Sequence, residues 1–267
     1  MRASRPPQGD RGFFFDDYPL FYETSETAAT AYRLDLRQRA MIQANREILA
    51  GARVLDLASH DGRWSFAALK AGAEHVIGVE ARAELVGNAR RTFAEYGVAA
   101  ECYEFVDGDL FRVLKRRDFD VDVVFCFGFM YHTLRYPDLL RGIVKAGPRH
   151  CVIDTKVIHG DEPLVHVLVD KAGVQSNGAR DRVSHGRNVL AGWPSLPALR
   201  LMLDAYDLDV EEEFDWAGLL AEHPEAPRLG DYATGNRVTL RCRSRHTPPA
   251  RSIADRAHED ARVPASV

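Results

Sequence analysis

Two carboxylates and a single glycine lie within one short turn, Asp56 to Gly62, which follows an apolar run. A third carboxylate, Glu80, ends the next apolar run. A turn that binds a pyrophosphate usually contains several glycines, because the backbone and the helix N-terminus must approach the phosphates closely. Negative charges beside a pyrophosphate would also repel it. The turn is therefore better suited to a ligand without phosphates.

The carboxylates of this turn suit a nucleoside that carries positive charge. S-adenosylmethionine (SAM) is an adenosine with a sulfonium and an amino group but no phosphate, so the turn favours SAM over NAD. Glu80 can accept hydrogen bonds from both ribose hydroxyls of either cofactor, because a carboxylate has two acceptor oxygens. This residue supports a nucleoside site without choosing between the two cofactors.

The elements that position these carboxylates form a βαβ unit. Residues 54–57 and 75–79 are apolar runs typical of strands, and residues 62–70 have helical spacing. A strand, a crossover helix and a parallel strand form a right-handed unit. Ligands of such folds bind at the carboxyl ends of the strands, where Asp56 and Glu80 lie.

Three further segments extend this pattern. Glu104 to Asp109 closes an apolar-rich segment with an acidic turn, and Val121 to Phe129 is a β-branched and aromatic run interrupted by Gly128. The sequence CVIDT, which contains Asp154, ends a fifth strand. We expect the strand ends to converge on one crevice.

These motifs resemble those of the class I SAM-dependent methyltransferases. Asp56 to Gly62 stands where that family has its D/E-x-G-x-G-x-G loop, and Glu80 resembles its ribose-binding acid. Gly108-Asp109 resembles its adenine-side turn, and Asp122 to Gly128 resembles its fourth motif. The order and spacing of four motifs, over roughly residues 37 to 156, are far more specific than a single glycine loop.

The resemblance implies a set of cofactor-binding residues on these loops. They are Asp56, Ala58, Ser59, His60, Gly62, Glu80, Asp109, Leu110, Phe127 and Gly128. Ala58 and His60 replace two glycines of the family. Histidine tolerates left-handed backbone better than most residues, so the loop is expected to keep its shape.

The resemblance also implies the fold. We expect an α/β class with a Rossmann-like, seven-stranded, mostly parallel sheet flanked by helices, and with an antiparallel final strand. An N-terminal helical cover and a lid-like insertion after the fifth strand, residues 157–194, would elaborate it. The methyltransferase domain is placed at 23–246, between a flexible tail with an aromatic segment at 1–22 and a flexible tail at 247–267.

The N-terminal cover has two parts. Phe13 to Tyr22 is dense in aromatic residues, and one helix is expected to carry the apolar positions from Leu36 to Leu49 and to end at Gly51. The helix is expected to pack against the sheet. The aromatic segment either packs in the core or covers the SAM crevice.

The insertion is expected to contain a strand at Pro163 to Val169 and then a long polar loop from Lys171 to Ser195. Within that loop, His185, Arg187 and Trp193 are candidates for binding an anionic or aromatic acceptor. A solvated loop is the alternative. Beyond it, the pattern predicts a helix at Leu196 to Ala205 and strands at Leu208 to Trp216 and Arg237 to Arg243.

Three residues are candidates for catalysis. Methyl transfer requires an acceptor in line with the sulfonium methyl, and a hydroxyl acceptor also requires a base. His132 is the candidate base, because it lies just past the fourth strand end; packing under the cofactor or capping a turn is the alternative. Tyr131 is a candidate hydrogen-bonding partner. Asp154 is placed to orient the acceptor or to cap a loop.

Composition limits the class of protein. A chain of 267 residues with 46% hydrophobic and 28% charged residues suits one globular catalytic domain, and a net charge of −4 gives no overall attraction to nucleic acid. The four cysteines show no metal-ligand spacing, so we expect reduced thiols and no metal. No secretory signal or membrane-length apolar run is found, which favours a soluble cytoplasmic protein.

The sequence thus favours an enzyme of small-molecule biosynthesis that transfers a methyl group from SAM to oxygen or nitrogen of a small-molecule acceptor, with a homodimer left open. Residues 127–140 also resemble the tRNA methyltransferases of wobble uridine, which need a basic face with exposed aromatics. Arg33, Arg37 and Arg39 are candidates for such a patch. A non-catalytic SAM-binding protein is a third possibility, suggested by Ala58 and His60.

Overall fold

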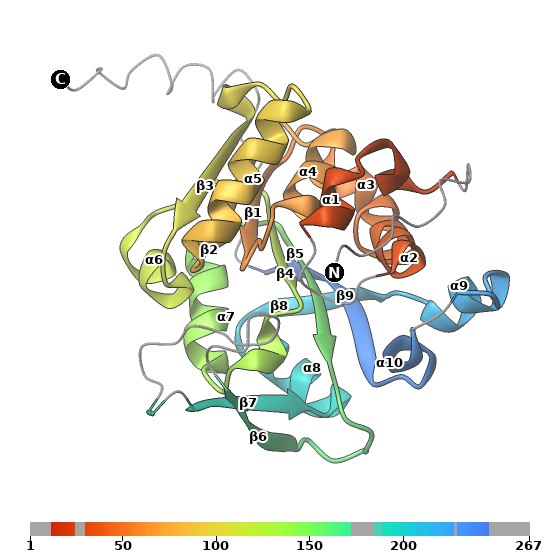
Figure 1. The fold of residues 1–267 in the computed structure, drawn as a ribbon. Coiled ribbons are helices and arrows are strands. Elements are labelled where there is room, and N and C mark those ends of the chain that lie inside the picture. The colour runs from red at the N-terminus through yellow and green to blue at the C-terminus, as the bar shows by residue number, and fades with distance from the viewer. Residues whose placement is uncertain (1–11, 25–29, 172–184, 187, 227–228, 246–267) are drawn as a thin grey trace.

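One seven-stranded sheet forms the centre of the computed structural model, which describes residues 12–24, 30–171, 185–186, 188–226 and 229–245 (Figure 1). The strand order is β3-β2-β1-β4-β5-β9-β8. The strands are β1 (Arg53–Leu57), β2 (His75–Glu80), β3 (Tyr103–Asp107), β4 (Val123–Phe127), β5 (His150–Lys156), β8 (Leu208–Glu213) and β9 (Arg237–Ser244). β9 runs antiparallel to both of its neighbours, β5 and β8, and the pairings from β3 to β5 are parallel. The predicted Rossmann-like sheet with an antiparallel final strand is confirmed.

Helices cover both faces of the sheet. On one face lie α2 (Ala31–Met41), α3 (Arg46–Leu49), α4 (Arg63–Lys70) and α5 (Ala83–Glu95); on the other lie α6 (Leu110–Arg116), α7 (Tyr136–Lys145) and α8 (Leu196–Ala205). Val54 packs in the first layer and its neighbour Leu55 in the second, as the twofold period of a strand requires. Because both faces are covered, the parallel strands are almost continuously apolar.

The N-terminal aromatic segment packs in the core of the first layer. It forms the short helices η1 (Phe14–Asp17) and α1 (Leu20–Glu23). Phe15 and Phe21 are fully buried, and the ring of Phe21 lies 5.2 Å from that of Phe66 in α4. These aromatic side chains therefore pack in the core rather than cover an open crevice.

The prediction of a single helix over residues 36–49 is wrong. The chain leaves α2 at Met41, forms the short helix η2 (Gln43–Asn45) and then begins α3 at Arg46. The side-chain amide of Asn45 donates to the Met41 carbonyl at 3.0 Å, so it satisfies an end group of α2 that a continuous helix would have used.

The insertion after β5 is a β-hairpin rather than a strand followed by a loop. β6 (Val165–Lys171) pairs antiparallel with β7 (Asn188–Pro194), so the last part of the expected polar loop is a strand. Val189 and Ala191 of β7 are buried, so these side chains pack in the interior although the surrounding sequence is polar. Arg187 lies outside the described residues.

The final elements follow the sequence pattern closely, with one correction. The helix α8 has the predicted bounds, but β8 ends at Glu213 and Trp216 begins the helix α9 (Trp216–Glu222). Asp215 ends the strand because its carboxylate accepts from the Gly218 backbone at 2.9 Å as an N-cap. The remaining short helices are η3 (Ala100–Cys102), η4 (Met130–His132) and α10 (Gly230–Ala233). None of the helices in the described part of the chain combines the length and apolar character that a membrane crossing requires.

Candidate active site

The turn after β1 holds three residues in the left-handed backbone region. Ala58 and His60 both have φ of 55°, and Gly62 has φ of 76°. These are the three positions at which the resembled loop has glycine, so the backbone keeps that conformation despite two side chains. A side chain at Gly62 is excluded, because its Cβ would lie 2.7 Å from the Phe105 ring.

Glu80 is fixed across this turn at the end of β2. Its Oε2 accepts from the His60 backbone N–H at 3.1 Å, and its Oε1 accepts from the backbone and Nε of Arg82, both at 3.0 Å. A carboxylate has about four acceptor positions. Three are in use, so one position on Oε2 is left for a ligand hydroxyl while Arg82 stays in place.

The two aspartates of the turn differ in charge. Burial raises the pKa of Asp56 to about 7, although Ser65 donates a hydrogen bond to it at 2.7 Å. Burial would also raise the pKa of Asp61, but the Arg63 guanidinium, whose Nε lies 2.8 Å away, outweighs burial and holds this pKa below its usual range. Thr24 of the N-terminal segment donates to Asp61 at 2.7 Å. The turn therefore carries one full negative charge, which is paired, and one aspartate that is only partly ionised near neutral pH.

Polar atoms of this loop are left for a ligand. Ser59 Oγ and His60 Nε2 are buried, and neither has a hydrogen-bond partner among the described residues. A buried polar group without a partner is costly, so such atoms indicate a missing ligand or water. The residues present therefore fit a polar, uncharged or cationic nucleoside such as SAM.

The third and fourth strand ends complete this crevice. Asp109 caps α6 by accepting from the Arg112 backbone at 2.9 Å, and Leu110 is buried beside it. Phe127 is buried at the end of β4, and Gly128 follows with φ of 76°. The predicted cofactor residues thus lie at the carboxyl ends of β1, β2, β3 and β4, as the strand pairing requires.

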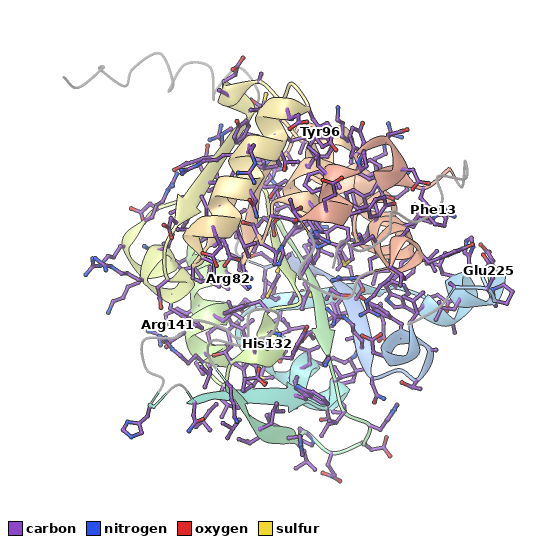
Figure 2. The ribbon with its side chains drawn as sticks, in the orientation of Figure 1. Phe13, Arg82, Tyr96, His132, Arg141 and Glu225 are labelled. Atoms are coloured by element: carbon purple, nitrogen blue, oxygen red, sulfur yellow. The ribbon has the colours of Figure 1, made fainter. Side chains whose placement is uncertain are left out.

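His132 forms a pair that the sequence did not predict. Its Nδ1 lies 2.7 Å from Oδ2 of Asp170, which is carried by β6 of the inserted hairpin. The two side chains are 16% and 19% exposed, so the pair is shielded but still accessible. His132 lies above the β6–β7 hairpin (Figure 2), and its ring is 4.2 Å from that of Tyr131.

Asp154 is committed to contacts within the protein. Arg237 Nε donates to it at 2.7 Å, Arg37 at 3.1 Å, Tyr232 at 2.8 Å and Thr239 at 2.9 Å. Burial alone would raise the pKa of Asp154, but the two guanidinium groups outweigh burial and lower it to about 2. Its carboxylate has no acceptor position left, so we do not place it in contact with an acceptor.

A comparison with protein families identifies the central part of the chain. Residues 54–146 match a family model described as a methyltransferase domain. This segment is therefore similar in sequence to methyltransferase domains. The match supports the prediction of a methyltransferase.

Solved structures share the fold of this methyltransferase. A SAM-dependent methyltransferase from Mesorhizobium loti is 14% identical with a TM-score of 0.52, and covers 76% of this chain and 97% of its own. The N-terminal domain of EvdMO1, solved with S-adenosylhomocysteine (SAH) and D-fucose, is 18% identical with a TM-score of 0.55 over 83% of this chain and 85% of its own. DhpI in complex with SAM and HEP is 18% identical with a TM-score of 0.54 over 85% and 92%. No curated protein matches the chain in sequence.

His185 and Trp193, the predicted substrate residues within the described part of the chain, do not come together. His185 is exposed and makes a backbone bridge to Asn188, whereas Trp193 contacts the Lys156 ammonium, whose Nζ lies 4.6 Å from its ring centroid. Of these candidates, Trp193 is the one linked to the catalytic candidates, because Lys156 Nζ also lies 5.2 Å from the Tyr131 ring.

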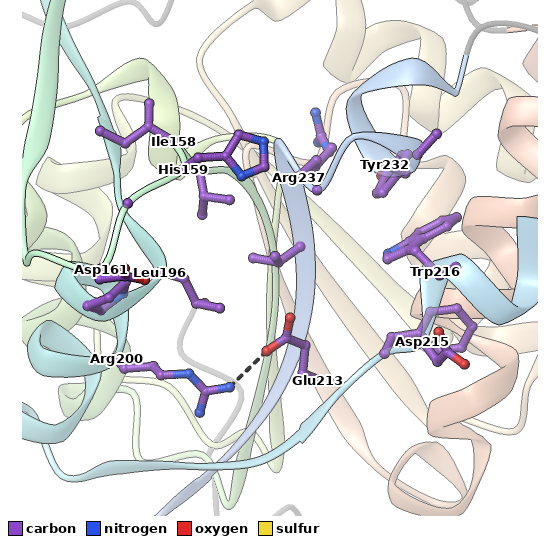
Figure 3. Close-up of a pocket in the computed structure, with 18 residues that line it drawn as sticks. Ile158, His159, Asp161, Leu196, Arg200, Glu213, Asp215, Trp216, Tyr232 and Arg237 are labelled. Atoms are coloured by element: carbon purple, nitrogen blue, oxygen red, sulfur yellow. Dashed lines mark hydrogen bonds and ion pairs between the residues drawn. The ribbon is translucent and has the colours of Figure 1, made fainter.

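A pocket of about 830 Å³ lies farther along the same sheet edge, beyond β5. Figure 3 shows Arg237 and Tyr232 at one end and the Arg200–Glu213 ion pair at the other. Arg237 Nη1 lies 3.4 Å from the Tyr131 hydroxyl, so Arg237 stands between this pocket and the end of β4. The pocket contains none of the predicted site residues.

Sequence reasoning missed Asp170, Lys156 and Arg237. Lys156 follows Asp154 by two residues on β5, so the strand period alone places both side chains on one face. No local signal links Asp170 to His132, because the pairing depends on how the hairpin docks. Among the described residues, no group of three or more His, Cys, Asp or Glu side chains is arranged to hold a metal ion.

Proposed function

We propose that this methyltransferase transfers the SAM methyl group to a hydroxyl of a small-molecule acceptor, with His132 as the general base. The contact between His132 and Asp170 is the single observation that carries this proposal. A hydroxyl acceptor must lose a proton during transfer, and an imidazole is the side chain best suited to accept it near neutral pH.

The crevice at the ends of β1 and β2 would hold the cofactor. When bound, SAM supplies a methyl group on a positively charged sulfur. Glu80 Oε2 accepts a ribose hydroxyl, and the loop from Ala58 to Gly62 offers Ser59 Oγ and His60 Nε2 to the polar part of the ligand. The low charge of Asp56 limits the repulsion between carboxylates in this loop.

Asp170 selects the tautomer of His132 that acts as a base. When Nδ1–H donates to the carboxylate, Nε2 carries the lone pair and accepts the hydroxyl proton. The Asp170 carboxylate then stabilises the imidazolium, because an opposite charge lies 2.7 Å from Nδ1. The residue therefore acts through His132 and not on the acceptor.

Two observations favour a small molecule as acceptor. Two of the solved structures named above are EvdMO1 in the presence of SAH and D-fucose and the complex of DhpI with SAM and HEP. The three arginines that are candidates for a tRNA-binding patch are also paired with carboxylates: Arg33 with Asp231, Arg37 with Asp154 and Arg39 with Asp35. Paired arginines have little charge to offer to a phosphate backbone.

The experiment that tests the proposal combines an acceptor screen with one substitution. Hydroxylated small molecules are incubated with methyl-labelled SAM, and the best acceptor is used to compare wild type with His132→Ala. We expect the variant to lower kcat by about 100- to 10,000-fold and to leave SAM affinity by calorimetry unchanged. Equal losses of SAM affinity and of rate would make His132 a binding residue and overturn its role as base.

A nuclear magnetic resonance measurement tests the same base without an acceptor. In wild type, the ¹⁵N shifts of His132 should report a protonated Nδ1 and an unprotonated Nε2. Asp170→Asn should disturb this preference, because an amide no longer requires Nδ1–H as its donor. His159, which is exposed, serves as the internal control in the same spectrum.

A further inference from the structure

Lys156 is a cation that has no counter-ion among the residues that the structure describes. It ends β5, is half-buried, and holds Nζ 4.6 Å from the Trp193 ring centroid and 5.2 Å from that of Tyr131. Within the described part of the chain, no carboxylate forms an ion pair with it. Aromatic rings attract and orient an ammonium group, but they leave its charge intact.

The neighbouring carboxylates are already committed elsewhere. Asp154, on the same face of β5, is shared by Arg37 and Arg237. Asp231 forms a two-point ion pair with Arg33, with both N–O distances at 2.7 Å. Asp170 is held by His132. Among these side chains, cations therefore outnumber carboxylates.

A second cation in this region has an unused donor. Arg37 Nε is buried and has no hydrogen-bond partner among the residues that the structure describes, although Nη2 of the same side chain contacts Asp154. Two guanidinium groups share one carboxylate, so the end of β5 carries excess positive charge. A bound SAM would add to it, because its sulfonium and ammonium outweigh its carboxylate.

Lys156 also lies close to the candidate base. Both side chains contact the Tyr131 ring, whose centroid lies 4.2 Å from that of the His132 ring and 5.2 Å from Lys156 Nζ. A small acceptor whose hydroxyl is at His132 can therefore extend a second group to the lysine. An anion there would replace the missing counter-ion, and a charge-assisted hydrogen bond to an ammonium is among the strong ones.

We propose that Lys156 binds an anionic oxygen group of the acceptor, either a carboxylate or a phosphate. The methyl acceptor is then a hydroxylated acid. This assignment rests on the proposed function for the place of the hydroxyl, but the anion site is measured without methyl transfer.

The test is a titration of the SAH-saturated protein with matched probes. 4-Hydroxybenzoate and 4-hydroxybenzamide have nearly the same shape and differ in charge, and inorganic phosphate serves as a third probe. We expect wild type to bind 4-hydroxybenzoate at least about tenfold more tightly than the amide. Lys156→Met should remove this preference, because it keeps an unbranched apolar chain without charge, and Lys156→Arg should retain it.

Lys70 provides a matched control. Its ammonium lies 5.4 Å from the Tyr18 ring and 5.3 Å from the Phe66 ring, so it makes the same kind of contact away from the crevice. Lys70→Met should keep the preference for the anion. Thermal unfolding of Lys156→Met checks that the fold is intact, with Lys156→Gln as a second neutral variant.

The outcomes are decisive in either direction. If wild type shows no preference for 4-hydroxybenzoate and does not bind phosphate, or if Lys156→Met and Lys156→Gln keep the preference, the anion site is overturned. Failure of His132→Ala to slow transfer would overturn the base and leave these titrations unaffected. The two failures are therefore distinguishable.

Discussion

At the scale of single residues, the cofactor turn adopts a backbone conformation that its side chains do not favour. Ala58 and His60 adopt left-handed φ values where the resembled family has glycine. Histidine enters this region more readily than most residues, so the prediction that the loop keeps its shape is confirmed.

Asp56 should make the stability of the ligand-free protein depend on pH. Burial raises its folded pKa to about 7, whereas an unfolded aspartate titrates near pH 3.9. Its contribution to stability is therefore fully present below about pH 4 and is lost as the pH rises through about 7. Relative to wild type, Asp56→Asn should gain on the order of 3 to 4 kcal/mol in free energy of unfolding between pH 4 and pH 8.

Urea unfolding at several pH values measures this difference. His75 and His150, whose pKa values are lowered by burial, act in the opposite direction below pH 6.5, but they are present in both proteins and cancel. Asp161→Asn, at an exposed position, is the control and should follow wild type. If the free energy of unfolding changes with pH in the same way for Asp56→Asn and wild type, the raised pKa of Asp56 is contradicted.

At the scale of elements, the β6–β7 hairpin places Asp170 beside His132. Gly192 of β7 is buried, and the Tyr136 hydroxyl donates to its carbonyl at 2.6 Å. A Cβ at this position would lie 2.6 Å from both Leu134 Cδ2 and Tyr136 Oη. The hairpin can therefore approach η4 and α7 only with glycine there.

Gly192→Ala should separate catalysis from cofactor binding. The added methyl group displaces β7, so we expect a loss of about 1 to 3 kcal/mol in stability and a lower kcat, because Asp170 moves relative to His132. SAM affinity by calorimetry should be unchanged. Gly87→Ala on α5, where a Cβ meets nothing within 4 Å, is the matched control. An unchanged kcat in a destabilised Gly192→Ala protein would show that the hairpin does not position the base.

Elements with a strong local pattern were predictable, and those defined by a distant partner were not. The βαβ unit from β1 to β2 and the helix α8 follow from apolar spacing alone. The strand β7 and the end of α2 at Met41 do not, because the first needs β6 as its partner and the second depends on the Asn45 side chain. The pairing of His132 with Asp170 escaped prediction for the same reason, since 38 residues separate them.

At the scale of the whole molecule, one buried network joins both ends of the chain. Arg37 from α2, Asp154 from β5, Tyr232 from α10 and Arg237 from β9 meet around a single carboxylate. The domain boundaries at 23 and 246 stay a prediction, as does a homodimer. The network shows that residues on either side of the matched 54–146 segment are part of one core.

Arg237→Met should be strongly destabilising. It leaves Asp154 buried with one arginine in place of two, so we expect a loss of about 3 to 5 kcal/mol in the free energy of unfolding. Arg200→Met, which breaks an exposed ion pair with Glu213, should cost less than about 1 kcal/mol. Denaturant unfolding of both variants measures the contrast. A loss for Arg237→Met no larger than that for Arg200→Met would show that the network contributes little.

The location of Asp170 has a consequence for how this protein can diversify. The cofactor crevice belongs to the sheet and its adjacent loops, whereas the partner of the base and the aromatic neighbour Trp193 belong to an inserted hairpin. Under the proposed function, the hairpin is an exchangeable module that sets both proton transfer and acceptor choice. Transplanting another hairpin onto this sheet would redirect the chemistry while the machinery for the methyl donor stays as it is.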